Sequence, residues 1–347
     1  MLRNALYSLM ILTILASASC SKKKSEPTEE PASTPFSVTV PLGLNQDLMV
    51  PKDNPLTAEK IALGHMLYFD TRLSADNTVS CATCHNPEKG WSDGMPVSTG
   101  IKGQQGTRNA PTVVNSTYMF SQFWDGRAPN LEEQSKGPII NPVEMGMEAH
   151  DLAVANIKNT PGYLPLFQKA FGEEPNIENI AKAIASFERT ILGGNSKFDR
   201  FQNGDENALN PEEKLGMELF FGKANCTRCH VGATFSDSQF HNLGVGMDKE
   251  KPDLGRYEIS KKEEDKGAFK TPTLRDVSRT APYMHDGSQT TLEEVIEFYD
   301  IGGEKNPHLD INMKPLGLTP EEKKALVAFM KALDSEPYPM VEQPKLP

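Results

Sequence analysis

Apolar and polar positions recur at helical spacing in several segments of this chain. Amphipathic patterns cover residues 56–69, 177–192, 211–221, 291–299 and 319–333. Long stretches rich in glycine and proline separate these segments, and neither alternating strand patterns nor hairpin signals stand out. The pattern therefore predicts a mainly α fold in which long ordered loops join short helices.

Several of these segments carry start and stop signals. Asn210 precedes Pro211, so the third segment begins with a favourable N-cap and with proline at the first helical position. Thr291 is followed three residues later by Glu294, which is the sequence of a capping box. Two glycines at residues 193–194 follow the second segment and are typical of a helix end.

A weak internal repeat divides the chain. Residues 63–69 and 215–221 both contain Leu-Gly followed by Leu and two aromatic residues, and both lead into a Cys-x-x-Cys-His motif. An amphipathic helix that runs into this motif is how a cytochrome c domain begins. The repeat therefore predicts two cytochrome c-type domains, residues 51–200 and 201–340, joined near residues 193–207.

The cysteines point to the cofactor. Four of the five form the two motifs Cys81-Ala-Thr-Cys84-His85 and Cys226-Thr-Arg-Cys229-His230. Two thiols at this spacing can add to the two vinyl groups of one haem, while the adjacent histidine binds the iron. A redox dithiol or a zinc site of four thiolates would also use cysteine pairs, but neither needs the histidine that follows both pairs. We therefore expect two covalent c-type haems, with His85 and His230 as proximal ligands.

The N-terminal residues have the features of an export signal. Residues 1–19 contain Arg3, then a short apolar stretch and small residues, and we interpret them as a signal peptide that is removed. Cys20 follows directly and resembles a bacterial lipoprotein processing site, although Leu15 lies two positions further upstream than usual. Plain secretion with a free thiol is the alternative. Residues 20–50 then hold the lipid-anchor cysteine and a polar, proline-rich tether. We expect a location in the periplasm or cell envelope.

Charge and hydropathy exclude other classes. The 347 residues include 36 Lys and Arg against 47 Asp and Glu, a net charge of −11. This balance argues against binding to nucleic acid, which usually requires a basic face, and leaves room for a basic protein partner. The single short apolar stretch excludes a protein that crosses the membrane several times, so the membrane contact is expected only through the lipid anchor.

Further motifs resemble those of the bacterial di-haem cytochrome c peroxidases and their methylamine-utilisation (MauG) relatives, with MauG-like proteins the closest branch. The resemblance extends over nearly all of residues 51–335. The segments that carry it are residues 69–74, 80–86, 108–112, 122–127, 137–138 with 143–145, and 281–287.

The resemblance implies roles for residues near the first haem. The haem at His85 would react with peroxide, and Glu144 would be its distal acid and base, with Gln134 nearby. A carboxylate beside an open iron can move a proton from the inner to the outer peroxide oxygen. Considered without the shared motifs, Glu144 would be interpreted as a surface acid at a helix end.

The resemblance also implies residues between the haems. Trp124 would relay electrons from one haem to the other, where the sequence alone would favour a core aromatic residue. Asn109, Thr280 and Pro282 would hold a calcium ion through side-chain and backbone oxygens, which suit a hard cation.

The first departure from the typical peroxidases is in the loop at residues 92–108. Typical members carry a histidine there, which caps the peroxide-reactive iron, but this loop has none and Ile101 falls at about that position. Met95 is the only alternative ligand in the loop. The first haem is therefore expected to be five-coordinate or water-bound without prior reduction.

The second departure is Tyr299, which replaces a methionine on the helix that follows residues 281–287. MauG relatives have tyrosine at this position, and the resemblance implies that Tyr299 binds the second iron. A phenolate stabilises oxidised iron and lowers the potential. The alternative is a tyrosine packed on the haem edge, with Met284 or Met313 as the ligand.

These observations favour a peroxidase-type oxidoreductase that reduces hydrogen peroxide at the first haem. Its electrons would come through the second haem from a small cytochrome c or copper protein. A MauG-like oxidase that modifies a side chain of a protein substrate is one alternative. A non-enzymatic di-haem electron carrier, with both irons six-coordinate, is another.

Overall fold

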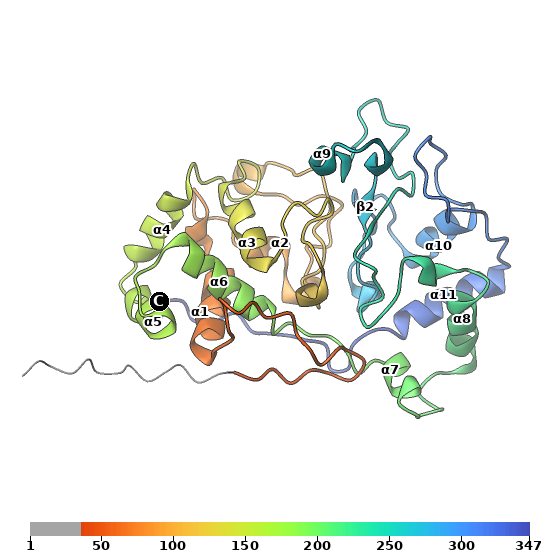
Figure 1. The fold of residues 1–347 in the computed structure, drawn as a ribbon, viewed down its shortest axis with the longest axis horizontal. Helices are drawn as coiled ribbons and strands as arrows, with labels where there is room; N and C mark the ends of the chain where they lie inside the picture. The colour runs from red at the N-terminus through yellow and green to blue at the C-terminus, as the bar shows by residue number, and fades with distance from the viewer. Residues whose placement is uncertain (1–35) are drawn as a thin grey trace, which may run out of the picture. The chain divides into compact units, whose positions relative to one another are not determined.

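The computed structural model describes residues 36–347. The predicted signal peptide at residues 1–19 and the lipidated Cys20 lie outside the described residues. Figure 1 shows short helices joined by long irregular segments, which confirms the prediction of a mainly α fold. None of the described helices is both long and apolar enough to cross a membrane.

Eleven α-helices, seven 3₁₀ helices and two short strands make up the described residues. The α-helices are α1 (Ala58–Tyr68), α2 (Cys81–Cys84), α3 (Leu131–Ile140), α4 (His150–Lys158), α5 (Tyr163–Phe171), α6 (Ile177–Glu188), α7 (Lys197–Gln202), α8 (Pro211–Phe221), α9 (Tyr257–Ser260), α10 (Leu292–Asp300) and α11 (Pro320–Lys331). The 3₁₀ helices are η1 (Thr71–Leu73), η2 (Pro87–Lys89), η3 (Ile101–Gly103), η4 (Ser116–Tyr118), η5 (Cys226–Arg228), η6 (Glu263–Asp265) and η7 (Val277–Arg279). Strands β1 (Phe240–His241) and β2 (Phe269–Lys270) pair antiparallel, with Phe240 opposite Lys270.

The five helices expected from the sequence are present as α1, α6, α8, α10 and α11. The predicted caps hold as well. Asn210 accepts a hydrogen bond from the Glu213 amide at 2.9 Å, and Glu213 accepts one from the Asn210 amide at 2.8 Å. Helix α6 ends at Glu188, five residues before Gly193, because the chain leaves the helix after the C-cap Arg189. Helices α2, α3, α4, α5, α7 and α9 were not expected.

The first half of the chain is built on the crossing of α1 and α6. Gly64 of α1 lies so close to α6 that a Cβ atom there would sit 1.8 Å from the Ala183 carbonyl oxygen. Leu63, Leu67 and Phe187 are almost fully buried around this crossing. Only a residue without a side chain allows the two helix backbones to approach this closely.

The second half repeats this crossing with α8 and α11. A Cβ atom on Gly216 would lie 1.9 Å from the Ala325 carbonyl oxygen, and Phe329 packs beside it as Phe187 packs beside Gly64. The buried apolar residues form two separate clusters, one around each helix pair. The repeat in the sequence is therefore also a repeat of helix packing.

Two extended segments lie across these helix pairs. Residues 36–50 belong to the expected tether, yet this part of it is held against the body: the Gly43 carbonyl accepts from Arg275 at 2.9 Å and the Leu42 carbonyl accepts from the Asn195 amide at 2.8 Å. The C-terminal segment returns to the first half, where the Pro339 carbonyl accepts from Trp91 Nε1 at 2.9 Å. Figure 1 shows the end of the chain beside α5 and α1.

Candidate functional site

The first Cys-x-x-Cys-His motif forms a single helical turn. Cys81 and Cys84 lie at the two ends of α2, and His85 follows as its C-cap with its amide donating to the Cys81 carbonyl at 2.9 Å. His85 Nδ1 lies 3.0 Å from the Pro111 carbonyl oxygen, and the Tyr68 hydroxyl donates to the His85 carbonyl at 3.0 Å. These contacts fix both the backbone and the ring of His85.

The second motif has the same arrangement. Cys226 starts η5, and the His230 amide donates to its carbonyl at 2.9 Å. His230 Nδ1 lies 2.8 Å from the carbonyl oxygen of Phe235. Within the described part of the chain, the four cysteines of the two motifs are unpaired thiols.

Both histidines are prepared to bind a metal through Nε2. A carbonyl acceptor at Nδ1 selects the tautomer with the proton on Nδ1 and leaves the Nε2 lone pair available. Burial lowers the pKa of His85 and of His230, which favours the neutral ring that ligates metals. Neither Nε2 atom makes a hydrogen bond with residues 36–347. The two motifs therefore fit the attachment of a c-type haem with an axial histidine.

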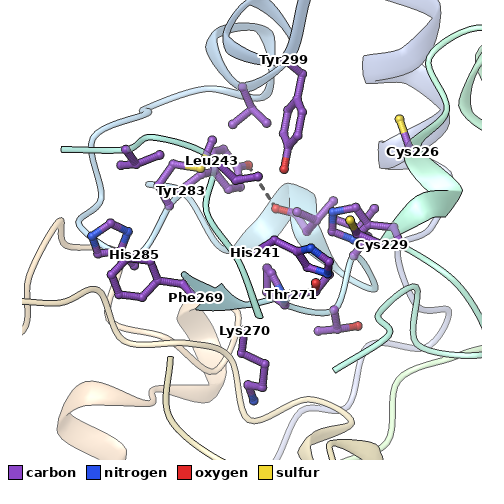
Figure 2. Close-up of a pocket in the computed structure, with 18 of the residues that line it drawn as sticks. Cys226, Cys229, His241, Leu243, Phe269, Lys270, Thr271, Tyr283, His285 and Tyr299 are labelled. Atoms are coloured by element: carbon purple, nitrogen blue, oxygen red, sulfur yellow. Dashed lines mark hydrogen bonds between the residues drawn. The ribbon is translucent and has the colours of Figure 1, made fainter. Parts of the chain in front are cut away.

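A largely apolar cavity adjoins the second motif, and Figure 2 shows part of its lining. Tyr299 of α10 points into it, and among the described residues its hydroxyl has no hydrogen-bond partner. Burial raises the pKa of this phenol, and the nearby Cys226 and Cys229 thiols act in the same direction. Met284 and Met313 line the same cavity. All three candidate ligands are thus brought to the second motif.

Trp124 also lines this cavity and connects it to the first motif. Its indole Nε1 donates to the Asn109 carbonyl at 2.9 Å. Two residues further along the chain, the Pro111 carbonyl accepts from the ring of His85. A short stretch of backbone therefore joins the predicted relay residue to the proximal histidine of the other motif.

Three oxygens at the predicted calcium site are available as ligands. Asn109, Thr280 and Pro282 all line the cavity that Trp124 lines. The Asn109 side-chain amide donates to the Met95 carbonyl at 2.8 Å, so its oxygen points away from that bond. Within residues 36–347 neither this oxygen nor the carbonyls of Thr280 and Pro282 accept a hydrogen bond. Oxygens of this kind suit Ca²⁺.

Glu144 lies in the turn that follows α3. Asn141 donates from Nδ2 to a Glu144 carboxylate oxygen at 2.7 Å. Burial raises the pKa of Glu144, while Arg127 and the Asn141 hydrogen bond oppose this shift. Burial raises the pKa of the Cys81 and Cys84 thiols, and the Glu144 charge acts in the same direction, so Glu144 is electrostatically coupled to the first motif.

The loop that lacks a histidine packs directly on this turn. The Ile101 amide donates to the Glu144 carbonyl at 2.9 Å, and the Ile101 side chain is buried against the Gly146 backbone. Met95, the alternative ligand in this loop, has a side chain that is about half exposed. Gln134 lies on α3, and its side chain makes no hydrogen bond with the described residues.

Sequence reasoning missed Arg127 as part of this site. Its guanidinium lies 3.5 Å from the centroid of the Phe123 ring and 3.0 Å from the Asp125 carboxylate. Its positive charge opposes the rise that burial causes in the pKa of Glu144. The motif at residues 122–127 contains Arg127, but only the fold shows that it acts on a residue seventeen positions later.

The remaining histidines near the second motif are already occupied. His241 Nδ1 lies 2.6 Å from Asp310, and its Nε2 lies 3.0 Å from Asp237. Contact with the Cys229 thiol and these two carboxylates raises the pKa of His241 to about 10. The ring of His285 is stacked on Phe269 at 3.6 Å between centroids. Neither histidine is placed as a free axial ligand.

The sequence has close relatives among characterised proteins. Residues 58–207 match the family model of the di-haem cytochrome c peroxidases. The chain is 45% identical over 301 residues to the methylamine utilization protein MauG of Methylorubrum extorquens, covering 86% of this chain and 84% of the relative. It is 40% identical over 296 residues to the cytochrome c551 peroxidase of Nitrosomonas europaea, covering 84% and 85%.

A solved structure gives the same result. A MauG-like protein associated with microbial copper homeostasis is 33% identical and superposes with a TM-score of 0.76, covering 87% of this chain and 95% of that one. The resemblance inferred from the sequence motifs is confirmed. The chain therefore belongs to the di-haem cytochrome c peroxidase family of oxidoreductases.

Proposed function

We propose that this chain is an exported di-haem enzyme that reduces hydrogen peroxide at an open first haem. Residues 51–200 would hold the peroxide-reactive haem on Cys81, Cys84 and His85. Residues 201–340 would hold the electron-transfer haem on Cys226, Cys229 and His230. The repeated crossing of α1 with α6 and of α8 with α11 supports this division.

One observation carries the proposal: the partly buried Glu144 carboxyl, which is electrostatically coupled to the first motif, lies beside a loop that offers no histidine. Ile101, where typical peroxidases have a capping histidine, is buried in the apolar core and has no atom that can ligate iron. The absence of a ligand at Ile101 supports an uncapped first iron, for which Glu144 would be the distal acid.

The residues of the first site divide the work of peroxide cleavage. When bound on His85, the haem supplies an iron that binds peroxide and accepts its two oxidising equivalents. Glu144 takes the proton from the inner peroxide oxygen and gives it to the departing oxygen. Asn141 orients the carboxylate, and Arg127 opposes the rise of its pKa that burial causes.

The residues of the second site prepare it to share the oxidising equivalents. Tyr299 would bind the second iron as an anionic phenolate and lower its potential, with Met284 and Met313 as the competing ligands. Trp124 would pass electrons between the two sites. Calcium held by Asn109, with Thr280 and Pro282, would fix the segments that meet around the indole.

The direct test is Glu144→Gln in the haem-loaded protein. We expect the rate of peroxide reaction to fall by about 10²–10⁴-fold, because the amide cannot transfer the proton, while the resting spectra stay unchanged. Glu148→Gln is the matched control, because it makes the same change at an exposed glutamate four positions later, and it should keep the wild-type rate. A wild-type rate in Glu144→Gln would contradict the proposal.

A second candidate function is oxidation of a protein side chain, and Tyr299 favours it. The 45% identical relative is itself named a methylamine utilization protein. Turnover with reduced cytochrome c separates the two: rapid turnover of the resting enzyme supports peroxide removal with a small cytochrome or copper protein as donor. Slow turnover supports a protein substrate.

We further propose export and a lipid anchor at Cys20, with the enzyme in the periplasm or cell envelope. The lipoprotein-like sequence before Cys20 supports this. The Cys20→Ala variant should move from the membrane fraction to the soluble fraction. Equal membrane association of both proteins would contradict the anchor.

A further inference from the structure

Lys270 of β2 makes hydrogen bonds to the first and the last residue of the segment 121–124, which carries Trp124. The Lys270 amide donates to the Trp124 carbonyl at 2.8 Å, and its ammonium Nζ donates to the Ser121 carbonyl at 2.8 Å. In Figure 2 its side chain points away from the centre of the second cavity, towards the faint tan ribbon of the first half. A lysine of one half thus contacts the proposed electron relay of the other.

The ammonium of Lys270 has no carboxylate of its own. Among the described residues it forms no ion pair, and Asp125 is the acidic group whose charge acts on it. That carboxylate is already bound by Arg108 at 2.6 Å and by Arg127 at 3.0 Å. Burial therefore dominates, and it lowers the pKa of Lys270 to about 8.

The charged groups on the surrounding elements add to a positive environment. Arg256 donates to the Asp125 carbonyl at 2.9 Å, and Arg108 also binds Asp253 at 2.7 Å. The basic groups around the segment are Arg108, Arg127, Arg256 and Lys270, and the acidic ones are Asp125 and Asp253. On the neighbouring strand β1, His241 is paired with Asp237 and Asp310, and next to β2 His285 is stacked on Phe269.

A positive environment opposes the oxidation of an indole. Loss of one electron from Trp124 creates a cation radical, and its Nε1 proton is held by the Asn109 carbonyl, which is too weak a base to remove it. The new positive charge therefore remains on the ring, in a segment whose Ser121 carbonyl binds the ammonium of a lysine that forms no ion pair among the described residues. Among the basic groups around the segment, Lys270 alone is not a guanidinium, so it is the one that can lose its proton readily.

We propose that Lys270 is a positioning residue that couples a proton to the electron relay at Trp124. When an electron leaves the indole for a haem site that peroxide has oxidised, the ammonium releases one proton to water. When an electron returns from the donor, the amine takes the proton up again. The positive charge near the indole is then unchanged through the cycle.

The proposal rests on the proposed function, in which peroxide oxidises the first site and Trp124 carries electrons. Its new content is that the relay depends on the protonation of one lysine. The Lys270 ammonium binds the carbonyl of Ser121, three residues before Trp124, and a unit charge near a group inside a protein changes an equilibrium constant by a factor of about 10 or more. The rate of the relay should therefore depend on pH around the titration of Lys270.

The test compares the haem-loaded wild type with Lys270→Arg and Lys270→Met. The measurement is the rate at which the spectrum of the second haem responds after mixing with peroxide, between pH 6 and pH 10. We expect the wild-type rate to rise about 10-fold with a midpoint near pH 8. Lys270→Arg should be slow at every pH, because arginine keeps its charge, and Lys270→Met should be fast at every pH.

Lys262→Met is the matched control, because Lys262 is an exposed lysine outside this segment, and it should keep the wild-type profile. A parallel experiment replaces peroxide by a flash-generated ruthenium(III) oxidant and measures the yield of the tryptophan radical in the same variants. This second experiment does not depend on the reaction with peroxide. It therefore tests the role of Lys270 even if the proposed peroxide reduction is wrong. Equal pH profiles in wild type, Lys270→Arg and Lys270→Met would overturn the role of Lys270.

Discussion

The two Cys-x-x-Cys-His sites are alike on the side of the histidine and different on the opposite side. Both histidines place Nδ1 on a backbone carbonyl, at 3.0 Å and 2.8 Å, and both motifs follow a helix that crosses its partner at a glycine. In the proposed function, the Glu144 carboxyl would face the haem held by His85. Across from His230 the chain offers the Tyr299 phenol and two methionine sulfurs.

The comparison separates the parts that the two halves share from the parts in which they differ. The helix crossing and the motif define how a haem would be attached, and they are the same in both halves. The distal groups come from later loops and helices, the turn after α3 and helix α10, so they can differ without disturbing the attachment. In the proposed function, the repeat would supply two similar cofactor sites, and the distal residues would divide the chemistry between them.

The largest expected effect removes the shared feature. Gly64→Val and Gly216→Val each place a branched side chain where a Cβ would already lie within 2 Å of a carbonyl oxygen. Each should lower the free energy of unfolding by about 3 kcal/mol or more through overpacking. Chemical denaturation of the two variants measures this. Gly106→Val is the control, because the nearest atom to a Cβ there would be the Ser98 carbonyl oxygen at 3.6 Å. A cost confined to one variant would show that the two crossings are not equivalent.

The next effect should be confined to the second site. Tyr299→Met exchanges an anionic oxygen ligand for a neutral sulfur, so the potential of that haem should rise by at least about 100 mV. Spectroelectrochemical titration measures the two potentials, and the potential of the first haem should stay within error of the wild type. An unchanged second potential would favour Met284 or Met313 as the ligand.

A smaller effect should be confined to the first site. Burial raises the pKa of Glu144 and the positive charge of Arg127 opposes this rise, so Arg127→Leu should raise the pKa further. The reaction needs Glu144 ionised to accept the first proton, so its rate falls as the pH is lowered. In Arg127→Leu this fall should begin at a higher pH than in the wild type. Stopped-flow mixing with peroxide across pH 4 to 8 measures this shift, and Arg127→Lys should retain most of the wild-type profile.

The smallest effect compares the caps of the equivalent helices α1 and α8. Asn210 and Glu213 bond each other reciprocally, whereas Thr57 accepts a single bond from the Lys60 amide at 3.3 Å. Asn210→Ala should therefore destabilise the protein by about 1 kcal/mol and Thr57→Ala by less. Thermal unfolding of the two variants decides the order, and a larger loss for Thr57→Ala would reverse it.

The helices predicted from the sequence are those whose signals are local. Helix α8 has its cap, its first proline and its apolar face within residues 210–221, so its bounds agree with the expected 211–221. Helix α3 was not expected because Gly137 and Pro138 lie inside it, where proline removes a backbone donor and usually marks a helix end. Strands β1 and β2 have two residues each, too few to show an alternating pattern.

The candidate sites divide in the same way. In each site the two cysteines and the histidine lie within one stretch of five residues, 81–85 or 226–230, so the sequence motif contains all three. The groups that tune these sites act over long separations: Pro111 accepts from His85 across 26 residues, and Lys270 bonds Ser121 across 149. Contacts of this length depend on how the helices pack, and no local pattern in the sequence encodes them.

The most direct test of an open first site and a phenol-bound second site is electron paramagnetic resonance of the resting ferric protein. We predict two signals of equal intensity: a high-spin signal from the haem on His85 and a low-spin signal from the haem on His230. Tyr299→Met should alter only the low-spin signal. Two low-spin signals in the wild type, with no high-spin component, would show that both irons are capped and would contradict the proposed peroxide chemistry.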